Sequence, residues 1–434
     1  MTDRVKEIVD GIAGKLVQYR RDFHKHPESG WTEFRTTSII ASKLKELGYE
    51  IKLGKDVICK ESMMGVPSEQ DLELHMKRAV EQGADPELVQ MMKGGLTGVV
   101  GELKCGEGPV MALRFDIDSN DISEVQDESH FPYREGFVSI NQNAMHACGH
   151  DGHASIGLGV AEVLTKLKDQ IKGTVRIIFQ PGEEGVRGAG PMVDAGVVDG
   201  VDFILGGHIG FRATKTGQFI CSTDKFLATT KFDVTFTGVP AHAGGAPEAG
   251  KNALLAAAAA ALNLHAIPRH GEGASRITVG VLNAGQGRNV IPPNALIKVE
   301  TRGETSEIDD FMFESAKNVI DGAAKMYGVK YDLKLMGKTK SGESDAEMME
   351  IVKKIAESMD FFDKNEIIDK TNMGGSEDYS HMMTAVQKSG GKGTFVMFGS
   401  ELTAGHHDYH FNFDESCLAP GVELYVRSVL NILS

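Results

Sequence analysis

The segment "MHACGHDGH", residues 145–153, concentrates metal-binding side chains in nine positions, although the whole chain has only five Cys and fifteen His. Its donors are His146, Cys148, His150 and His153. The thiolate of Cys148 and the imidazole of His150 can face one ion, because Gly149 between them lets the backbone turn tightly. Asp151 follows directly and can orient an imidazole from outside the ligand shell. A Cys-x-His pair also arises by chance, so the motif needs support from other segments.

Two adjacent carboxylates, Glu183 and Glu184, follow the apolar segment "TVRIIFQ" within "FQPGEEG". Carboxylates at the mouth of a sheet repel each other and lose solvation unless a cation compensates them. One of the two can then bind an ion, while the other takes a proton from a water molecule. Surface Glu-Glu pairs are common, but the position after a buried strand and Pro181 favours a site.

Histidines follow two further apolar segments. His208 ends "FILGGHIG", and His406, His407 and His410 come shortly after "GTFVMFGS". A lone histidine at either place is more often a core or loop residue than a ligand. Together with the first two motifs, however, these histidines make four donor-bearing loops after four strands, at the edge where open α/β sheets place their sites. We therefore predict that the four segments converge on one metal centre.

The number of donors fits two divalent ions better than one. The predicted ligands are Cys148, His150, Glu184, His208 and His407. They exceed a tetrahedral set, and a bridging ligand holds a pair of ions about 3.5–4 Å apart. The Cys148 thiolate is the candidate bridge. Soft sulfur suits zinc, whereas mixed carboxylate and imidazole ligation also suits manganese, so both ions remain candidates.

The order of helical and strand-like segments indicates an α/β fold with a mainly parallel sheet and helices on both faces. Residues 1–227 and 341–434 are expected to form this metal-binding domain. The segments "TGVVGEL" and "GPVMALRFDID" are expected to be neighbouring strands around the turn "KCGEG". Residues 228–340 have the β-α-β-β-α-β order of a ferredoxin-like α+β domain, which is predicted to be inserted.

A helical insertion is expected at about residues 56–95. Ser68 is the predicted N-cap of its first helix, and Asp85-Pro86 the start of its second. The insertion is either an interface, a wall of the substrate pocket, or a surface excursion of the kind that costs little stability. Near the other end of the chain, "SEDYS", residues 376–380, is expected to cap the helix that follows it rather than to touch substrate.

Length and composition place further bounds. A chain of 434 residues is too long for one hydrophobic core, and 41% hydrophobic with 25% charged residues is typical of a globular protein. The formal net charge of −15 disfavours nucleic acid as a partner. No segment reads as a signal peptide or a membrane span, and five widely spaced Cys make a poor disulfide framework. We expect a cytoplasmic enzyme that does not associate with a membrane.

These motifs, in this order, resemble the co-catalytic metallopeptidase family that includes aminoacylase and the glutamate carboxypeptidases. "MHACGHDGH", "FQPGEEG" and "HHDYHFNFDE" resemble its amidohydrolase branch, with the hippurate hydrolases and the plant indole-acetyl-amino acid hydrolases. The helical insertion and "KFDVTFTGVPAHAGGAPEAGKNALLAAA" resemble most closely the aminobenzoyl-glutamate utilisation proteins. The resemblance implies hydrolysis of the amide of a small N-acyl or N-aroyl amino acid, with N-(4-aminobenzoyl)glutamate as the first candidate.

The resemblance also implies roles for single residues. It makes the five predicted donors the ligands, with His407 preferred to His406, and Glu183 the general base. Asp118 matches a carboxylate that orients a metal ligand, and His242 a histidine that polarises the scissile carbonyl, often across a dimer interface. Arg288 and Asn289 match a loop that holds the substrate's carboxylate. Residues 228–340 are then a lid and dimerisation domain of a homodimer, and whether a related second subunit is needed is left open.

Alternatives remain at this stage. His242 and Asn289 fit loop residues that only shape a hairpin, and Arg288 fits a surface ion pair. The substrate range of a general N-acyl amino acid deacylase or a dipeptidase is also compatible with the motifs, because selectivity resides in pocket shape. "DIDSND" departs from the D-x-D-A-L-P pattern of many relatives, which puts the substrate preference in question. A different class is a non-catalytic metal-stabilised binding or assembly protein, which would not need Glu183.

Overall fold

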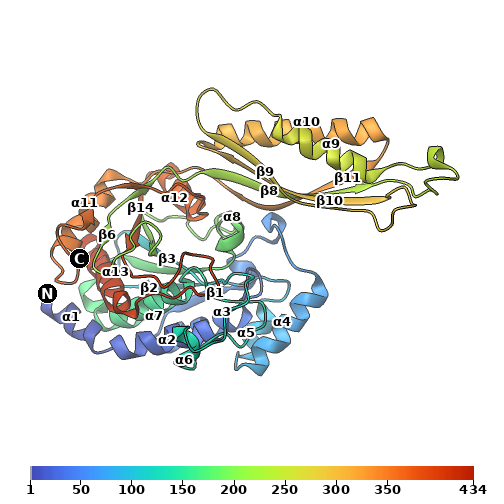
Figure 1. Cartoon of the computed structure of the whole chain (residues 1–434). Helices are drawn as coiled ribbons and strands as arrows, with labels where there is room; N and C mark the ends of the chain where they lie inside the picture. Colours follow the sequence, from blue (N-terminus) through green and yellow to red (C-terminus); the bar gives the residue numbers. More distant parts are fainter. Residues whose placement is uncertain (1) are drawn as a thin grey trace. The chain divides into compact units, whose positions relative to one another are not determined.

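The computed structural model describes residues 2–434, which divide into two compact units. Unit 1 comprises residues 2–224, Glu343–Met373 and Asp378–Ser434, and unit 2 comprises Lys225–Gly342 and Gly374–Glu377. Figure 1 shows the helices and strands of each unit. Within residues 2–434, none of the helices combines the length and the apolar character that a bilayer crossing requires.

Unit 1 contains an eight-stranded sheet in the order β1-β2-β4-β3-β5-β14-β6-β12. Its strands are β1 (Glu50–Leu53), β2 (Val99–Lys104), β3 (Val110–Asp116), β4 (Thr174–Gln180), β5 (Phe203–Ile209), β6 (Phe219–Ile220), β12 (Ile367–Ile368) and β14 (Lys392–Phe398). The central strands β4, β3, β5 and β14 pair in parallel, as do β12 and β6, whereas β1–β2, β2–β4 and β14–β6 are antiparallel. The short strands β7 (Thr223–Asp224) and β13 (Thr371–Asn372) form a separate parallel pair. The predicted mainly parallel α/β sheet is confirmed.

The predicted pairing of "TGVVGEL" with "GPVMALRFDID" is wrong. These segments form β2 and β3, but β4 lies between them, antiparallel to β2 and parallel to β3. The turn-like "KCGEG" suggested a local hairpin. A crossover through α7 (His150–Lys166) instead returns the chain beside β3, so that the apolar strand β4 is buried at the centre of the sheet.

Helices cover both faces of this sheet (Figure 1). A Cβ at Gly206 would meet Tyr379 of α12 (Tyr379–Lys388), and one at Gly207 would meet Tyr425 of α13 (Leu418–Leu433). Because neighbouring residues of a strand point to opposite faces, α12 and α13 lie on opposite sides of β5. On the α13 side, α7 packs close to the sheet, since a Cβ at Gly157 would lie 2.5 Å from the Phe179 ring.

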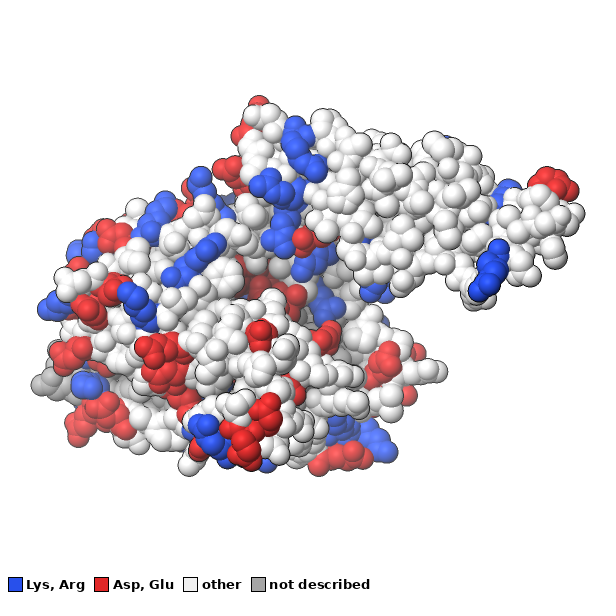
Figure 2. Space-filling view, viewed as in Figure 1, with Lys and Arg blue, Asp and Glu red and all other residues white. Residues whose placement is uncertain are grey.

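The other helices of unit 1 surround this core. They are α1 (Thr2–Asp10), α2 (Ala13–Lys25), α3 (Phe34–Glu46), α4 (Glu69–Glu81), α5 (Pro86–Met91), α6 (Phe131–Arg134), α8 (Ala189–Asp194) and α11 (Ala346–Glu357). The helices α4 and α5 form the predicted insertion. Its caps are confirmed: the Ser68 side chain accepts a hydrogen bond from the Asp71 amide, and that of Asp85 accepts one from Glu87. On the face of unit 1 drawn in Figure 2, acidic side chains are interspersed with Lys and Arg.

Unit 2 has an antiparallel sheet in the order β11-β8-β10-β9. Its elements are β8 (Ala228–Thr237), α9 (Ala253–His265), β9 (Ser275–Ala284), β10 (Asn294–Gly303), α10 (Ser306–Tyr327) and β11 (Lys330–Thr339). Buried alanines of α9, such as Ala256 and Ala260, pack with Phe232 and Phe236 of β8 in one apolar cluster. The predicted ferredoxin-like β-α-β-β-α-β order is confirmed.

Candidate metal centre

The five predicted ligands come from the ends of the central strands and the start of α7, and the structure brings their donor atoms together. The donor atoms of Cys148, His150 and His208 lie within 4.8 Å of one another, and so do those of Cys148, Glu184 and His407. Cys148 therefore belongs to both groups. This is the geometry expected of a thiolate that bridges two ions.

Cys148 and His208 are both buried at the centre of the cluster. The Cys148 Sγ lies 3.4 Å from the His208 Nε2, while the His208 Nδ1 donates to the carbonyl oxygen of Ile209. Burial lowers the pKa of His208 well below its usual value, so that its ring is neutral and Nε2 carries a lone pair. Burial and the neighbouring Glu184 and Glu183 carboxylates raise the pKa of the Cys148 thiol. A thiolate at this position therefore requires a cation.

Glu184 faces two imidazoles. Its Oε2 lies 3.2 Å from the His407 Nε2, and its Oε1 lies 4.0 Å from the His150 Nε2. Glu184 Oε1 and His150 Nε2 are buried, and neither has a hydrogen-bond partner among the described residues. A divalent ion would satisfy both atoms, because buried polar atoms without partners are costly. The donor set and these two atoms thus fit the predicted metal centre.

The backbone around His407 is unusual. His407 adopts a φ of 67°, in the left-handed region, and conformations of this kind cluster at functional sites. Its neighbour His406 points elsewhere, since the His406 Nε2 donates to the Ile209 carbonyl oxygen at 3.2 Å. The geometry favours His407 over His406 as a ligand.

Asp118 orients one of these donors. The His150 Nδ1 donates to the Asp118 backbone oxygen at 3.0 Å and lies 3.2 Å from its Oδ1, while Oδ2 accepts from the Glu184 amide at 2.9 Å. With its proton on Nδ1, His150 presents the Nε2 lone pair to Glu184. This contact is typical of carboxylates that support metal-bound histidines.

Glu183 is buried and begins the short helix η4 (Glu183–Gly185), with a carboxylate oxygen within 4.8 Å of donor atoms of His150 and Glu184. The turn before it is fixed by Glu33, which the sequence analysis missed. Glu33 Oε1 accepts from the Gly182 amide at 2.8 Å, and burial together with the Asp118 charge raises the pKa of Glu33 to about 8. A contact over 149 residues leaves no local signal in the sequence.

The expectation that "SEDYS" caps the helix after it is wrong. Asp378 makes no side-chain cap of α12, and instead its Oδ2 accepts from the amides of Gly188 and Ala189. Its Oδ1 accepts from Arg114 Nη2 at 3.1 Å and from Gln180 Nε2 at 2.7 Å. A buried guanidinium is a stronger partner than a helix amide, which explains the difference. Asp378 thereby anchors the loop that follows Glu184.

Asp151 also differs from its expected contact. Its Oδ2 accepts from Arg20 Nε and His24 Nδ1, both at 2.8 Å, so Asp151 orients His24 and not a ring of the metal centre. Arg20 is fully buried and also donates to Asn412 at 2.7 Å. Arg20 therefore ties the start of α7, next to His150, to the segment that follows His407.

Replacing Arg20 by methionine is expected to lower the free energy of unfolding by about 3–5 kcal/mol, because the Asp151 carboxylate would stay buried without its guanidinium. Urea unfolding of the two proteins measures the change. Arg134, whose side chain is 51% exposed, provides the control: Arg134→Met should change stability by no more than about 0.5 kcal/mol. A loss below about 1 kcal/mol in Arg20→Met would contradict this role of Arg20.

The predicted residues of unit 2 lie in one irregular hairpin. His242 forms an isolated β-bridge with Val290, and the Ala243 amide donates to the Asn289 carbonyl oxygen. The His242 Nδ1 accepts from the Gly244 and Gly245 amides at 3.1 and 3.0 Å, which places its proton on Nε2. Arg288 and Asn289 are exposed in the turn before Val290.

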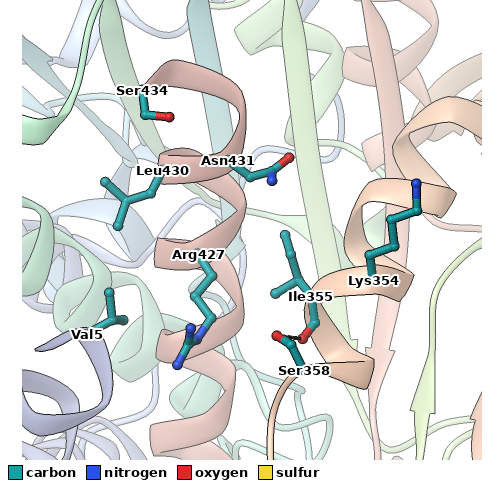
Figure 3. Close-up of a pocket in the computed structure, with 8 residues that line it drawn as sticks. All are labelled: Val5, Lys354, Ile355, Ser358, Arg427, Leu430, Asn431 and Ser434. Atoms are coloured by element: carbon teal, nitrogen blue, oxygen red, sulfur yellow. Dashed lines mark hydrogen bonds between the residues drawn. The ribbon is translucent and has the colours of Figure 1, made fainter. Parts of the chain in front are cut away.

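A separate pocket of about 360 Å³ lies among α1, α11 and α13 (Figure 3). It is lined by apolar side chains, such as Val5, Ile355 and Leu430, with Lys354 and Arg427 beside them. It contains none of the predicted site residues. The candidate chemistry therefore remains with the cluster around Cys148.

Residues 112–431 match the family described as Peptidase family M20/M25/M40, and the chain belongs to this family. It is 48% identical over 431 residues to one subunit of the p-aminobenzoyl-glutamate hydrolase of Escherichia coli (strain K12), covering 99% of this chain and 98% of the relative. It is also 48% identical over 429 residues to indole-3-acetyl-aspartic acid hydrolase of Enterobacter agglomerans, covering 98% of each. The chain is thus a metal-dependent hydrolase of amide bonds.

Solved structures agree with this assignment. An aminobenzoyl-glutamate utilization protein from Klebsiella pneumoniae matches with a TM-score of 0.85 and 43% identity, covering 98% of each chain. A dinuclear metal-binding peptidase of the M20 family from Bacillus subtilis matches with a TM-score of 0.66 and 25% identity, covering 98% of this chain and 99% of that one. The resemblance to the co-catalytic metallopeptidases is confirmed.

Proposed function

We propose that this enzyme hydrolyses the amide bond between an aromatic acyl group and an acidic amino acid, with N-(4-aminobenzoyl)glutamate as the first candidate. The observation that carries the chemistry is the pair of donor groups that share Cys148, with Glu183 beside them. The names of the two relatives at 48% identity carry the substrate class, because one acts on p-aminobenzoyl-glutamate and the other on indole-3-acetyl-aspartic acid.

The cofactor in this proposal is a pair of divalent ions, Mn²⁺ or Zn²⁺. The residues that would hold them are Cys148, His150, Glu184, His208 and His407. When bound, such ions lower the pKa of water and polarise a carbonyl oxygen. Asp118 keeps His150 in the tautomer that binds an ion.

Glu183 moves the proton in this proposal. Its carboxylate takes a proton from the attacking water and delivers it to the departing amide nitrogen. The His242 Nε2 donates a hydrogen bond to the oxygen of the tetrahedral intermediate, and Arg288 with Asn289 holds the α-carboxylate of the amino acid. Residues 228–340 act as the lid that carries these groups, with residues 1–227 and 341–434 as the catalytic domain.

His242→Ala is expected to lower kcat about 10²–10³-fold, the usual effect of losing one oxyanion donor. Metal content should not change, because His242 is not one of the proposed ligands. Steady-state kinetics and elemental analysis measure the two quantities. His265→Ala, at an exposed position of the same unit, is the control. An unchanged kcat, or loss of bound metal, would contradict the role.

The function is tested with a panel of substrates. The apoenzyme is loaded with manganese or zinc, or held in chelator, and assayed on N-(4-aminobenzoyl)glutamate, N-acetyl amino acids, hippurate and dipeptides. The proposal predicts metal-dependent release of 4-aminobenzoate with the highest kcat/KM in the panel. Faster cleavage of N-acetyl amino acids or dipeptides would favour a general deacylase or a dipeptidase. No hydrolysis with either metal would favour a non-catalytic assembly protein.

The assembly proposed for the enzyme is a homodimer formed through residues 228–340, and the further partner proposed is a related second subunit. The name of the Escherichia coli relative supports this partner, since that protein is one lettered subunit of its hydrolase. Light scattering of the purified chain tests the homodimer. An activity assay of the chain alone tests whether a second subunit is required.

A further inference from the structure

Arg187 is a cation without a matching anion beside the metal centre. It lies three residues after Glu184, between β4 and α8, and is partly buried. Its Nη1 donates to the Gly65 carbonyl oxygen at 2.8 Å and its Nη2 to that of Gly30 at 3.4 Å. Among residues 2–434, no carboxylate oxygen lies within 4.0 Å of this guanidinium. Two backbone oxygens leave its positive charge uncompensated.

Glycines make room for this guanidinium. A Cβ at Gly30 would lie 2.8 Å from the Arg187 Nη2, and one at Gly185 would lie 2.6 Å from its Nε. Any side chain at either position would displace the group. The guanidinium is therefore fixed in place by backbone rather than by a counter-ion, as expected of a preorganised anion receptor.

A second cation, Arg78 of α4, approaches the same segment. Arg78 Nε and Nη2 are buried and have no hydrogen-bond partner in the described part of the chain. The nearest carboxylate is that of Glu28, at 4.0 Å. Glu28 accepts from the Arg35 and Thr36 amides, and burial raises its pKa, so it compensates Arg78 poorly. The helical insertion thus adds positive potential beside Arg187.

The segment between these two arginines runs along the metal centre. The Glu28 carbonyl oxygen accepts from the Ser119 amide, and Ser119 directly follows Asp118. The only carboxylate bound to the segment by a side chain within the described residues is Asp121, which accepts from Ser29 at 2.5 Å. Arg78 and Arg187 therefore lie on a wall beside Asp118 and Glu184, in a chain whose net charge is −15.

We propose that Arg187, supported by Arg78, receives the side-chain carboxylate of the substrate's acidic amino acid. This inference rests on the proposed function and adds the basis of its selectivity. The α-carboxylate is already assigned to Arg288 and Asn289, whereas the second carboxylate lacked a partner. A guanidinium held by backbone can form charge-assisted hydrogen bonds with a carboxylate that reaches it. The helical insertion then serves as a wall of the substrate pocket.

The test compares N-(4-aminobenzoyl)glutamate with N-(4-aminobenzoyl)glutamine, which has the same shape but no second charge. Arg187→Gln is expected to lower kcat/KM for the glutamate substrate about 10–100-fold, mainly through KM, since a hydrogen bond to a charged group is lost. The value for the glutamine substrate should change less than about 3-fold, within the effect of a neutral contact. Arg187→Lys should recover part of the loss, and Arg78→Gln should show a smaller loss with the same preference.

Several outcomes would overturn the inference. An equal loss on both substrates would make Arg187 a structural link between Gly30 and Gly65, and unchanged kinetics on both would show that it does not meet the substrate. Arg134→Gln is the matched control and should change neither value. If Arg187→Gln does not fold, as judged by thermal unfolding, Arg187→Lys and Arg78→Gln decide by the same ratio. If the unmodified enzyme hydrolyses neither compound, the proposed function fails first and this inference falls with it.

Discussion

Glu183→Gln is expected to lower kcat for amide hydrolysis about 10²–10⁴-fold, the contribution usual for a general base or acid. Glutamine keeps the size and hydrogen-bonding oxygen of the side chain but cannot take up a proton at neutral pH. The assay is release of 4-aminobenzoate by the metal-loaded enzyme, with KM measured in parallel. Because Glu183 acts twice in the proposed reaction, on the water and on the leaving nitrogen, the loss should appear in kcat.

Metal content separates this role from a structural one. The Glu183→Gln protein should retain the metal content of the unmodified chain by elemental analysis, since Glu183 is proposed as a base and not as a ligand. Glu135→Gln, at an exposed position, is the control and should keep full activity. Full activity in Glu183→Gln would remove the base assignment, and loss of metal would make Glu183 a ligand.

Cys148→Ala is expected to have the second large effect, on metal binding itself. Cys148 is the residue shared by the group with His208 and the group with Glu184 and His407. Losing a shared ligand should lower the metal content per chain to half or less. Activity should fall at least about 10²-fold, because the ions supply several kcal/mol to the transition state. Elemental analysis after gel filtration measures the first quantity.

Cys417→Ala is the matched control, because Cys417 is also buried but belongs to none of the donor groups found in the described chain. It should retain metal and activity. A Cys148→Ala protein with the full metal content would contradict the bridging role. In that case, the ions would depend on the imidazoles and on Glu184 alone.

Much of the fold and of the donor cluster could be predicted from the sequence. Apolar runs such as "TVRIIFQ" are followed directly by polar donors, and the carboxyl ends of parallel strands meet at one edge of a sheet. That rule alone brings Glu184 near His208. The ferredoxin-like order of unit 2 followed from helical and strand periodicity within one continuous segment.

Partner choice over long distances could not be predicted. β2 pairs with β4 and not with β3, because burial of an apolar central strand outweighs a local turn. Asp378 turns away from its own helix toward Arg114, and Asp151 toward Arg20, because buried guanidinium groups attract carboxylates more strongly than a nearby amide does. Glu33 carries no motif that marks its contact with Gly182.

The central claim is that five side chains enclose two ions with Glu183 beside them. Anomalous X-ray diffraction from crystals of the manganese- or zinc-loaded enzyme tests it most directly. The account predicts two anomalous peaks about 3.5–4 Å apart, with the Cys148 Sγ coordinating both ions. A single peak, or peaks whose nearest donors lie outside the set Cys148, His150, Glu184, His208 and His407, would contradict it.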